Sequence, residues 1–153
     1  MSKKENNLYQ EENEMDWVWI YVANGMPCLC CGKIEYPFPN YICDAHTNGM
    51  DKYGHLEFQI VIDFGPQIVG KLLNIMGYRV KNGERFKDGD VLKDFFPCDV
   101  FLKEVSNGYG KRVLRLIIPD TKGRLPEHAD RPYCLQMLDT PLLYELKNKN
   151  TKE

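Results

Sequence analysis

The chain has 153 residues, a formal net charge of −2 and 43% hydrophobic residues, which is the size and apolar content of one globular domain. The lack of a basic excess argues against a nucleic-acid-binding protein, and no apolar run approaches the roughly 20 residues of a membrane-spanning helix. The polar N-terminal residues lack the apolar core of a signal peptide, so we expect a cytoplasmic protein with reduced cysteines, binding neither nucleic acid nor membrane.

The first half of the chain predicts a polar tail, three strands and one helix. Residues 1–15 are charged and rich in amide side chains, which is typical of a flexible tail. Runs of β-branched and aromatic residues predict strands at 17–22, 41–47 and 56–64. The main helix is expected at about residues 66–82, because Pro66 suits a first helical turn and apolar residues then recur at the spacing of one buried face.

The second half predicts a hairpin and a short last strand. Residues 98–105 and 112–118 read as two strands joined by a tight turn, and 133–138 as another strand. Residues 145–153 are polar and predict a C-terminal tail. The sequence therefore predicts a single α+β domain over residues 16–144, with a mostly antiparallel sheet packed on one main helix.

The segment at residues 26–46 is rich in cysteine and proline, which excludes a long helix or a central strand there. It contains two chelating pairs, each with a two-residue gap, which is how zinc-binding folds present four ligands to one ion. We therefore expect a structural zinc ion held by Cys28, Cys31, Cys43 and His46. Cys30 is an adjacent thiol that could replace one of these ligands.

Two other interpretations fit the same residues. Free cysteines pack well as small apolar side chains, so the four residues could be buried without a metal. A redox role for the Cys28–Cys31 pair is the third interpretation, although a proline-rich loop follows the pair where a redox motif normally begins a helix. Cys98 and Cys134 lie among apolar neighbours and are expected to be inert.

Several short motifs recur in an order that resembles a known family. They are His46-Thr47-Asn48-Gly49-Met50, Gly54-His55-Leu56-Glu57, Gly83-Glu84-Arg85-Phe86, Ile118-Pro119-Asp120, Gly123-Arg124-Leu125-Pro126 and Gln136. Over residues 41–143 this order resembles the bacterial family named Domain of Unknown Function 4262. That family carries no established activity, so the resemblance implies a shared architecture. The Cys28–Cys31 pair lies outside the matched part.

Two functions are compatible with these residues. The first is a binding or regulatory module with a structural zinc ion and a protein partner, because no coherent catalytic group is present. The alternative is a small metal-dependent hydrolase using His46, His55 and Glu57, with His128 and Asp120 as further ligands. No two of the histidines have the spacing of a known metal motif.

Three further patterns have simpler explanations. Asp120 is followed by Lys122 and Arg124, which could bind an anion, although a turn in which Asp120 accepts local amides is the commoner structure. Trp17, Trp19 and Tyr21 alternate along the first strand, which favours packing against the core over a ligand platform. Pro119-Asp120 with Glu145-Leu146-Lys147 matches the letters of a nuclease signature, and we attribute this match to chance.

Overall fold

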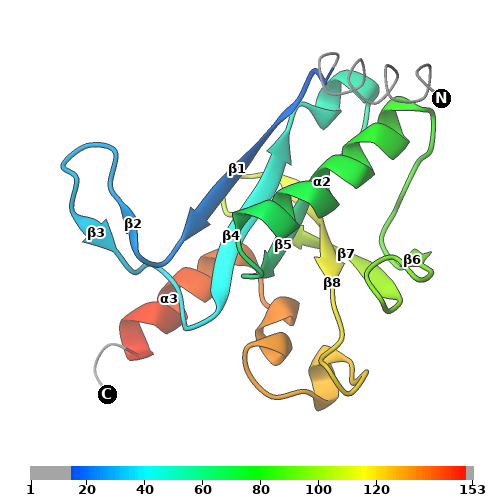
Figure 1. The fold of residues 1–153 in the computed structure, drawn as a ribbon. Helices are drawn as coiled ribbons and strands as arrows, with labels where there is room; N and C mark the ends of the chain where they lie inside the picture. The colour runs from blue at the N-terminus through cyan, green and yellow to red at the C-terminus, as the bar shows by residue number, and fades with distance from the viewer. Residues whose placement is uncertain (1–14, 151–153) are drawn as a thin grey trace.

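A six-stranded sheet forms the centre of the fold (Figure 1). The computed structural model describes residues 15–150, with side chains for 15–146, so residues 1–14 of the predicted N-terminal tail lie outside the described residues. The strand order is β1-β4-β5-β8-β7-β6. The strands are β1 (Val18–Ala23), β4 (Ile42–Asn48), β5 (Glu57–Ile62), β8 (Arg112–Ile117), β7 (Val100–Ser106) and β6 (Val91–Leu92).

Neighbouring strands of this sheet are antiparallel, except that β5 and β8 run parallel. The exception arises because helix α2 (Pro66–Lys81), β6 and β7 lie between β5 and β8 along the chain. The predicted α+β architecture is confirmed, with a mostly antiparallel sheet and a main helix at the expected place. The predicted hairpin is the β7–β8 pair.

Helix α2 covers one face of the sheet over β1, β4 and β5 (Figure 1). Its two buried glycines let aromatic rings of β1 and the residue before it lie directly on the helix. A Cβ atom at Gly70 would come within 2.3 Å of Trp19, and one at Gly77 within 2.5 Å of Trp17. Both tryptophans therefore belong to the core, as their alternation predicts.

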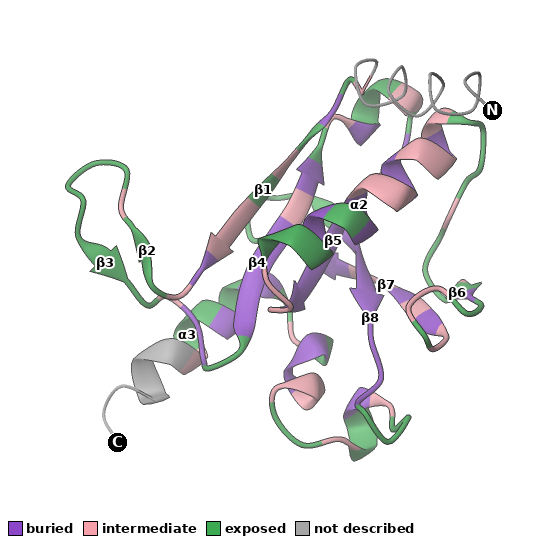
Figure 2. Cartoon of the chain, in the orientation of Figure 1, coloured by how far each residue is buried: buried purple, intermediate pink, exposed green. Residues whose placement is uncertain are grey.

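The opposite face of the sheet is covered only in part. The 3₁₀ helix η3 (Tyr133–Met137) and helix α3 (Thr140–Asn150) pack there against β4 and β5 (Figure 2). A second apolar core cluster lies on this face and consists of Phe38, Ile42, Val61, Ile62, Leu135 and Leu143. Helix α3 extends through residues 145–150, for which the sequence predicts a polar tail. No described helix has the length and apolar character needed to cross a membrane.

The predicted strand at 133–138 is wrong, because these residues form η3. Gln136 explains the difference. Its side-chain oxygen accepts the N–H of Ile118 at 2.8 Å, and its side-chain nitrogen donates to the Ile118 carbonyl oxygen at 2.8 Å. One side-chain amide thus pairs with both backbone groups just beyond β8, where the backbone of another strand would otherwise pair.

The segment at 26–46 first forms a small hairpin and then enters strand β4. Strands β2 (Met26–Pro27) and β3 (Ile34–Glu35) form a small separate hairpin that projects from the domain (Figure 1). Asn24 fastens the base of this hairpin: its side chain donates to the Phe38 carbonyl oxygen at 2.9 Å and accepts the Phe38 N–H at 3.0 Å. Two short 3₁₀ helices, η1 (Met50–Tyr53) and η2 (Pro126–His128), complete the described elements.

Candidate functional site

The four predicted zinc ligands do not come together in this fold. Cys28 and Cys31 lie between β2 and β3, whereas Cys43 is fully buried in β4 and donates from Sγ to the Ile60 carbonyl oxygen, 3.7 Å away. Cys43 and His46 are three residues apart on one strand, so their side chains point to opposite faces of the sheet. Within the described residues, no group of three or more His, Cys, Asp and Glu side chains is placed to hold a metal ion.

His55 has both ring nitrogens engaged. Nδ1 donates its proton to the Leu56 carbonyl oxygen at 2.8 Å, and Nε2 accepts the backbone N–H of Phe86 at 3.0 Å. A histidine binds a metal through a free nitrogen lone pair, and here that lone pair already accepts a hydrogen bond. His55 therefore joins the start of β5 to the segment after α2.

Glu57 organises the turn between β4 and β5. Its carboxylate accepts the Thr47 hydroxyl at 2.7 Å, the Gly49 N–H at 3.0 Å and the Met50 N–H at 3.0 Å. Thr47 in turn accepts the N–H of Phe58 at 2.9 Å. The carboxylate thereby satisfies backbone donors at the start of η1, a role that requires no ligand.

The other groups of the predicted hydrolase site have local roles. Asp120 accepts the N–H groups of Lys122 and Arg124 at 3.0 and 2.8 Å, and also the Arg124 side chain at 2.7 Å. These bonds hold the pKa of the Asp120 carboxyl below its usual range despite its burial. His128 is exposed on η2. Residues 120–124 therefore form a turn in which Asp120 accepts local amides, the commoner of the two structures considered for this segment.

Polar side chains cross the sheet on the face opposite α2. The strand register places Ile20, His46, Gln59, Arg115 and Lys103 next to one another in a single row over five strands. Gln59 and Arg115 at its centre are 1% and 0% exposed. Buried polar groups of this kind are stable only when hydrogen-bonded, and both Gln59 and Arg115 are hydrogen-bonded.

Arg115 binds the chain segment that covers it. Its guanidinium donates to Gln59 Oε1 at 2.8 Å, to the Thr140 hydroxyl at 3.3 Å, and to the carbonyl oxygens of Gln136 and Leu138. Burial lowers the pKa of Arg115 to about 10, which leaves the guanidinium charged at neutral pH. One buried cation thus fastens η3 and the start of α3 to the sheet.

Asp44 and His46 form a pair at the outer end of this network. His46 Nδ1 lies 3.0 Å from Asp44 Oδ1, and Gln59 donates to the same oxygen at 3.0 Å. Burial opposes ionisation of Asp44, but the hydrogen bond and charge of His46, aided by Gln59 and Arg115, lower its pKa. The hydrogen bond to Asp44 raises the pKa of His46, against the effect of burial. The pair therefore favours an imidazolium beside a carboxylate.

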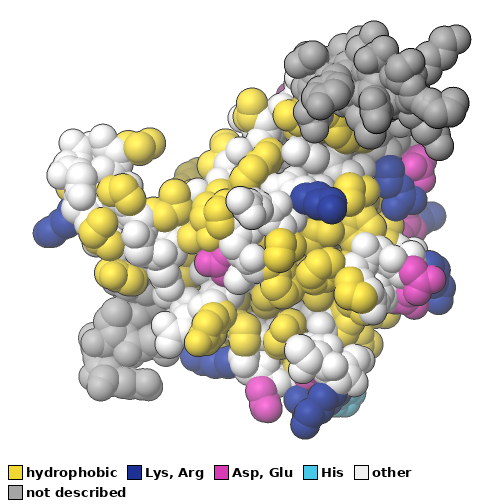
Figure 3. All heavy atoms as spheres, in the orientation of Figure 1, with side chains coloured by type: hydrophobic (Ala, Val, Ile, Leu, Met, Phe, Trp, Pro, Cys, Tyr) yellow, Lys and Arg dark blue, Asp and Glu magenta, His cyan; other side chains and the backbone are white. Residues whose placement is uncertain are grey.

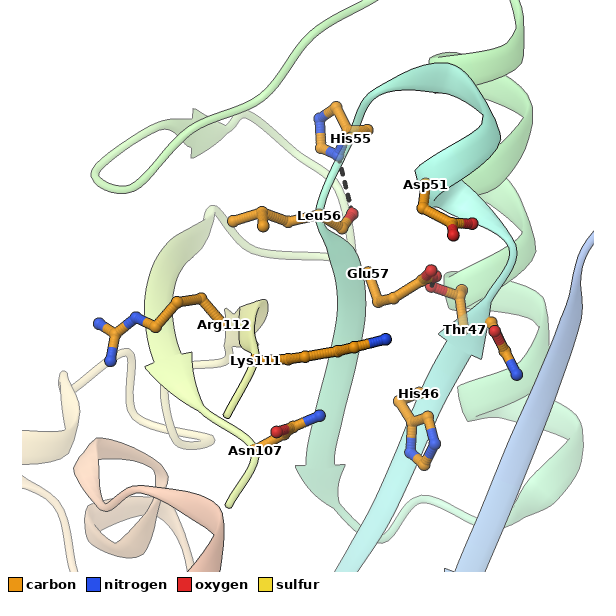
Figure 4. A pocket seen from close by; sticks show the side chains of 10 residues that line it. His46, Thr47, Asp51, His55, Leu56, Glu57, Asn107, Lys111 and Arg112 are labelled. Atoms are coloured by element: carbon orange, nitrogen blue, oxygen red, sulfur yellow. Dashed lines mark hydrogen bonds between the residues drawn. The ribbon is translucent and has the colours of Figure 1, made fainter. Parts of the chain in front are cut away.

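A pocket of about 430 Å³ lies beside His46, where α3 leaves the sheet uncovered. Figure 4 shows Lys111 extending from the β7–β8 connection across this pocket, between Glu57 and His46. The lining side chains that carry charge or amide groups are His46, Asn48, Asp51, Glu57, Asn107 and Lys111, with Arg112 at the edge. The Glu57 carboxylate is hydrogen-bonded to donors of its own chain. Arg112 pairs with Glu104 at 3.0 Å.

We expect the Asp44–His46 pair to make the free energy of unfolding depend on pH in two opposite ways. Because the folded-state pKa of His46 is raised, its contribution is present below the reference value of 6.5 and lost as pH rises through the folded pKa. The lowered pKa of Asp44 gives a contribution present above 3.8 and lost as pH falls. Urea unfolding across this range measures both effects.

His46→Asn should remove the loss of stability above the reference pKa of histidine. His128→Asn is the matched control, because His128 lies on the exposed surface of η2. Equal pH profiles for the two variants and the wild type would contradict the assignment of this pH dependence to His46.

Sequence reasoning missed Asp44, Gln59, Arg115 and Lys111. A signal existed for Arg115, since it is a charged residue in the middle of an apolar run that pairs with strands on both sides. A charge at such a position must be buried and needs partners. Its partners are far away in the sequence, so the run itself does not identify them.

Comparisons with known proteins do not identify this site. No protein-family model, no curated protein and no solved structure matches the chain. The resemblance to Domain of Unknown Function 4262 therefore stays a prediction.

Proposed function

We propose that this protein is a binding module whose pocket beside His46 takes an anionic group, such as a carboxylate or a phosphate. The observation that carries the proposal is the pair of cationic side chains on opposite sides of the pocket. His46 has a raised pKa, and Lys111 crosses the pocket toward it (Figure 4). The amides of Asn48 and Asn107 add neutral hydrogen-bond donors to the same lining.

The carboxylates near the pocket repel a bound anion less strongly than their number suggests. Glu57 is compensated by three donors of its own chain. Asp44 lies below His46 and is 9% exposed, so it favours the imidazolium instead of meeting the ligand. Asp51 is the one carboxylate of the lining for which no such compensation is described. Charge-assisted hydrogen bonds from a lysine and an imidazolium therefore favour an anionic ligand.

The same binding chemistry suits a partner protein, because an exposed aspartate or glutamate presents such a group. The alternative, a metal-dependent hydrolase using His46, His55 and Glu57, has less support. Two of its three residues already use their lone pairs within the chain, and only His46 has a ring nitrogen with no described hydrogen bond.

Titration with inorganic phosphate, followed by ¹⁵N–¹H NMR spectra, tests the proposal. We expect saturable shifts at residues of the pocket, and binding that weakens as pH rises through the titration of His46. Lys111→Ala should reduce the affinity by about tenfold, because one charge-assisted hydrogen bond is lost. Lys71→Ala is the control, since Lys71 is an exposed lysine of α2, on the other face of the sheet. Equal affinities of these two variants would refute the assignment.

A further inference from the structure

The tip of the β2–β3 hairpin is a tight turn built around Cys28. The Cys28 N–H donates to the Lys33 carbonyl oxygen at 2.7 Å, and the Gly32 N–H donates to the Cys28 carbonyl oxygen at 2.8 Å. Gly32 has a φ of 74°, a conformation that glycine adopts without strain. The turn folds the chain back immediately after Cys31, so that Cys28 and Cys31 share one end of the hairpin.

Backbone amides of this turn point at the Cys28 sulfur. The N–H of Cys30 lies 3.4 Å from Cys28 Sγ. Such donors stabilise a thiolate, the form in which cysteine binds a metal. The turn thus places Cys28 and Cys31 at one end of the hairpin, with a backbone donor directed at the Cys28 sulfur.

The hairpin does not pack against the rest of the domain. Cys30 and Cys31 are exposed, and so are the apolar side chains beside them. These are Met26, Leu29, Ile34 and Tyr36, of which Leu29 is fully exposed. Figure 3 shows hydrophobic side chains, a class that there includes cysteine, on this projection. An exposed apolar end with thiols indicates an interface.

Two sulfur ligands are too few for a structural zinc ion, which takes four in a tetrahedron. Cys43 is buried in the core, and within the described residues no group of three or more His, Cys, Asp and Glu side chains is placed to hold a metal ion. A two-fold axis through the ion would bring an identical pair from a second copy of the chain and complete the four ligands. Four thiolates around Zn²⁺ carry a charge of about −2, and the Lys33 of each copy lies next to the pair.

We propose that this hairpin is a metal half-site and that two copies of the chain share one Zn²⁺ through Cys28 and Cys31 of each. Four Zn–S bonds form, the thiols release their protons to solvent, and no group is oxidised or reduced. Leu29 of each copy is buried against the other hairpin in the same step. The site is independent of the anion pocket, which involves other residues.

Zinc content and mass in solution test the proposal together. The chain is purified with a non-thiol reductant, loaded with Zn²⁺ alone, and measured by elemental analysis and light scattering. We expect about 0.5 zinc per chain in a dimer, and a return to monomer when a chelator removes the metal. Co²⁺ in place of zinc should give the intense sulfur-to-metal absorption of four thiolates.

Cys28→Ser and Cys31→Ser should each abolish both zinc binding and dimerisation. Cys30→Ser is the matched control and should retain both. Because the hairpin is separate from the core, we expect all three variants to keep the melting temperature of the metal-free domain, which shows that they fold. One zinc per monomer, or a dimer that survives metal removal, would overturn the proposal. So would loss of zinc in the Cys30 variant alone.

Discussion

Arg115→Met is expected to lower the free energy of unfolding by about 3–5 kcal/mol, the cost of removing one partner from a buried charged network. The substitution removes one of the two cations, Arg115 and His46, whose charges favour the ionised carboxylate of Asp44. It also leaves the carbonyl oxygens of Gln136 and Leu138 without a donor. Urea denaturation at neutral pH measures the change.

Arg112→Met is the control for this variant. Arg112 lies three residues earlier on the same strand, but it is exposed and pairs with Glu104 at the surface. Surface ion pairs contribute about 0–1 kcal/mol, so the two arginines should differ by several-fold in their effect. A similar loss of stability in both variants would show that Arg115 does not hold η3 and α3 to the sheet as described.

Glu57→Ala is expected to destabilise the fold by about 2–3 kcal/mol, because backbone donors that the carboxylate satisfies lose their acceptor. The affected donors are the N–H groups of Gly49 and Met50, and the Thr47 hydroxyl is freed at the same time. Hydrogen exchange should accelerate first in η1 and at the end of β4. Thermal and urea unfolding give the size of the effect.

The matched control for Glu57 is Glu104→Ala, which removes a partly exposed carboxylate paired with Arg112. We expect it to cost less than about 1 kcal/mol. If Glu57→Ala were equally mild, water entering the adjacent pocket would have replaced the carboxylate, and the turn would not depend on it.

The motifs that carry the family resemblance have mainly structural roles in this fold. Thr47 and Glu57 organise the turn before η1, and His55 links that turn to the segment after α2. Gln136 completes the edge of the sheet beyond β8. Several residues of these motifs, including His46, Asn48 and Glu57, also line the pocket beside His46.

Local patterns in the sequence predict most of the elements of this fold. Proline and the apolar spacing locate α2, and the alternation of β-branched and aromatic residues locates β1, β4 and β5. The turn between residues 106 and 112 predicts the β7–β8 hairpin. These predictions succeed because each depends on residues within a few positions of one another, whose backbone preferences are set locally.

The site depends on contacts that no local pattern contains. Arg115 and Gln59 are 56 residues apart, and Gln59 and Thr140 are 81 apart. The side of the sheet that a residue faces also decides which side chains can form a site together. The spacing of Cys43 and His46 predicts chelation if the chain turns between them, but a continuous strand sends them to opposite faces. The sequence thus determined most of the elements and the thiol pair of the hairpin. Only the tertiary structure decided which polar groups meet, because burial and strand register bring distant residues together.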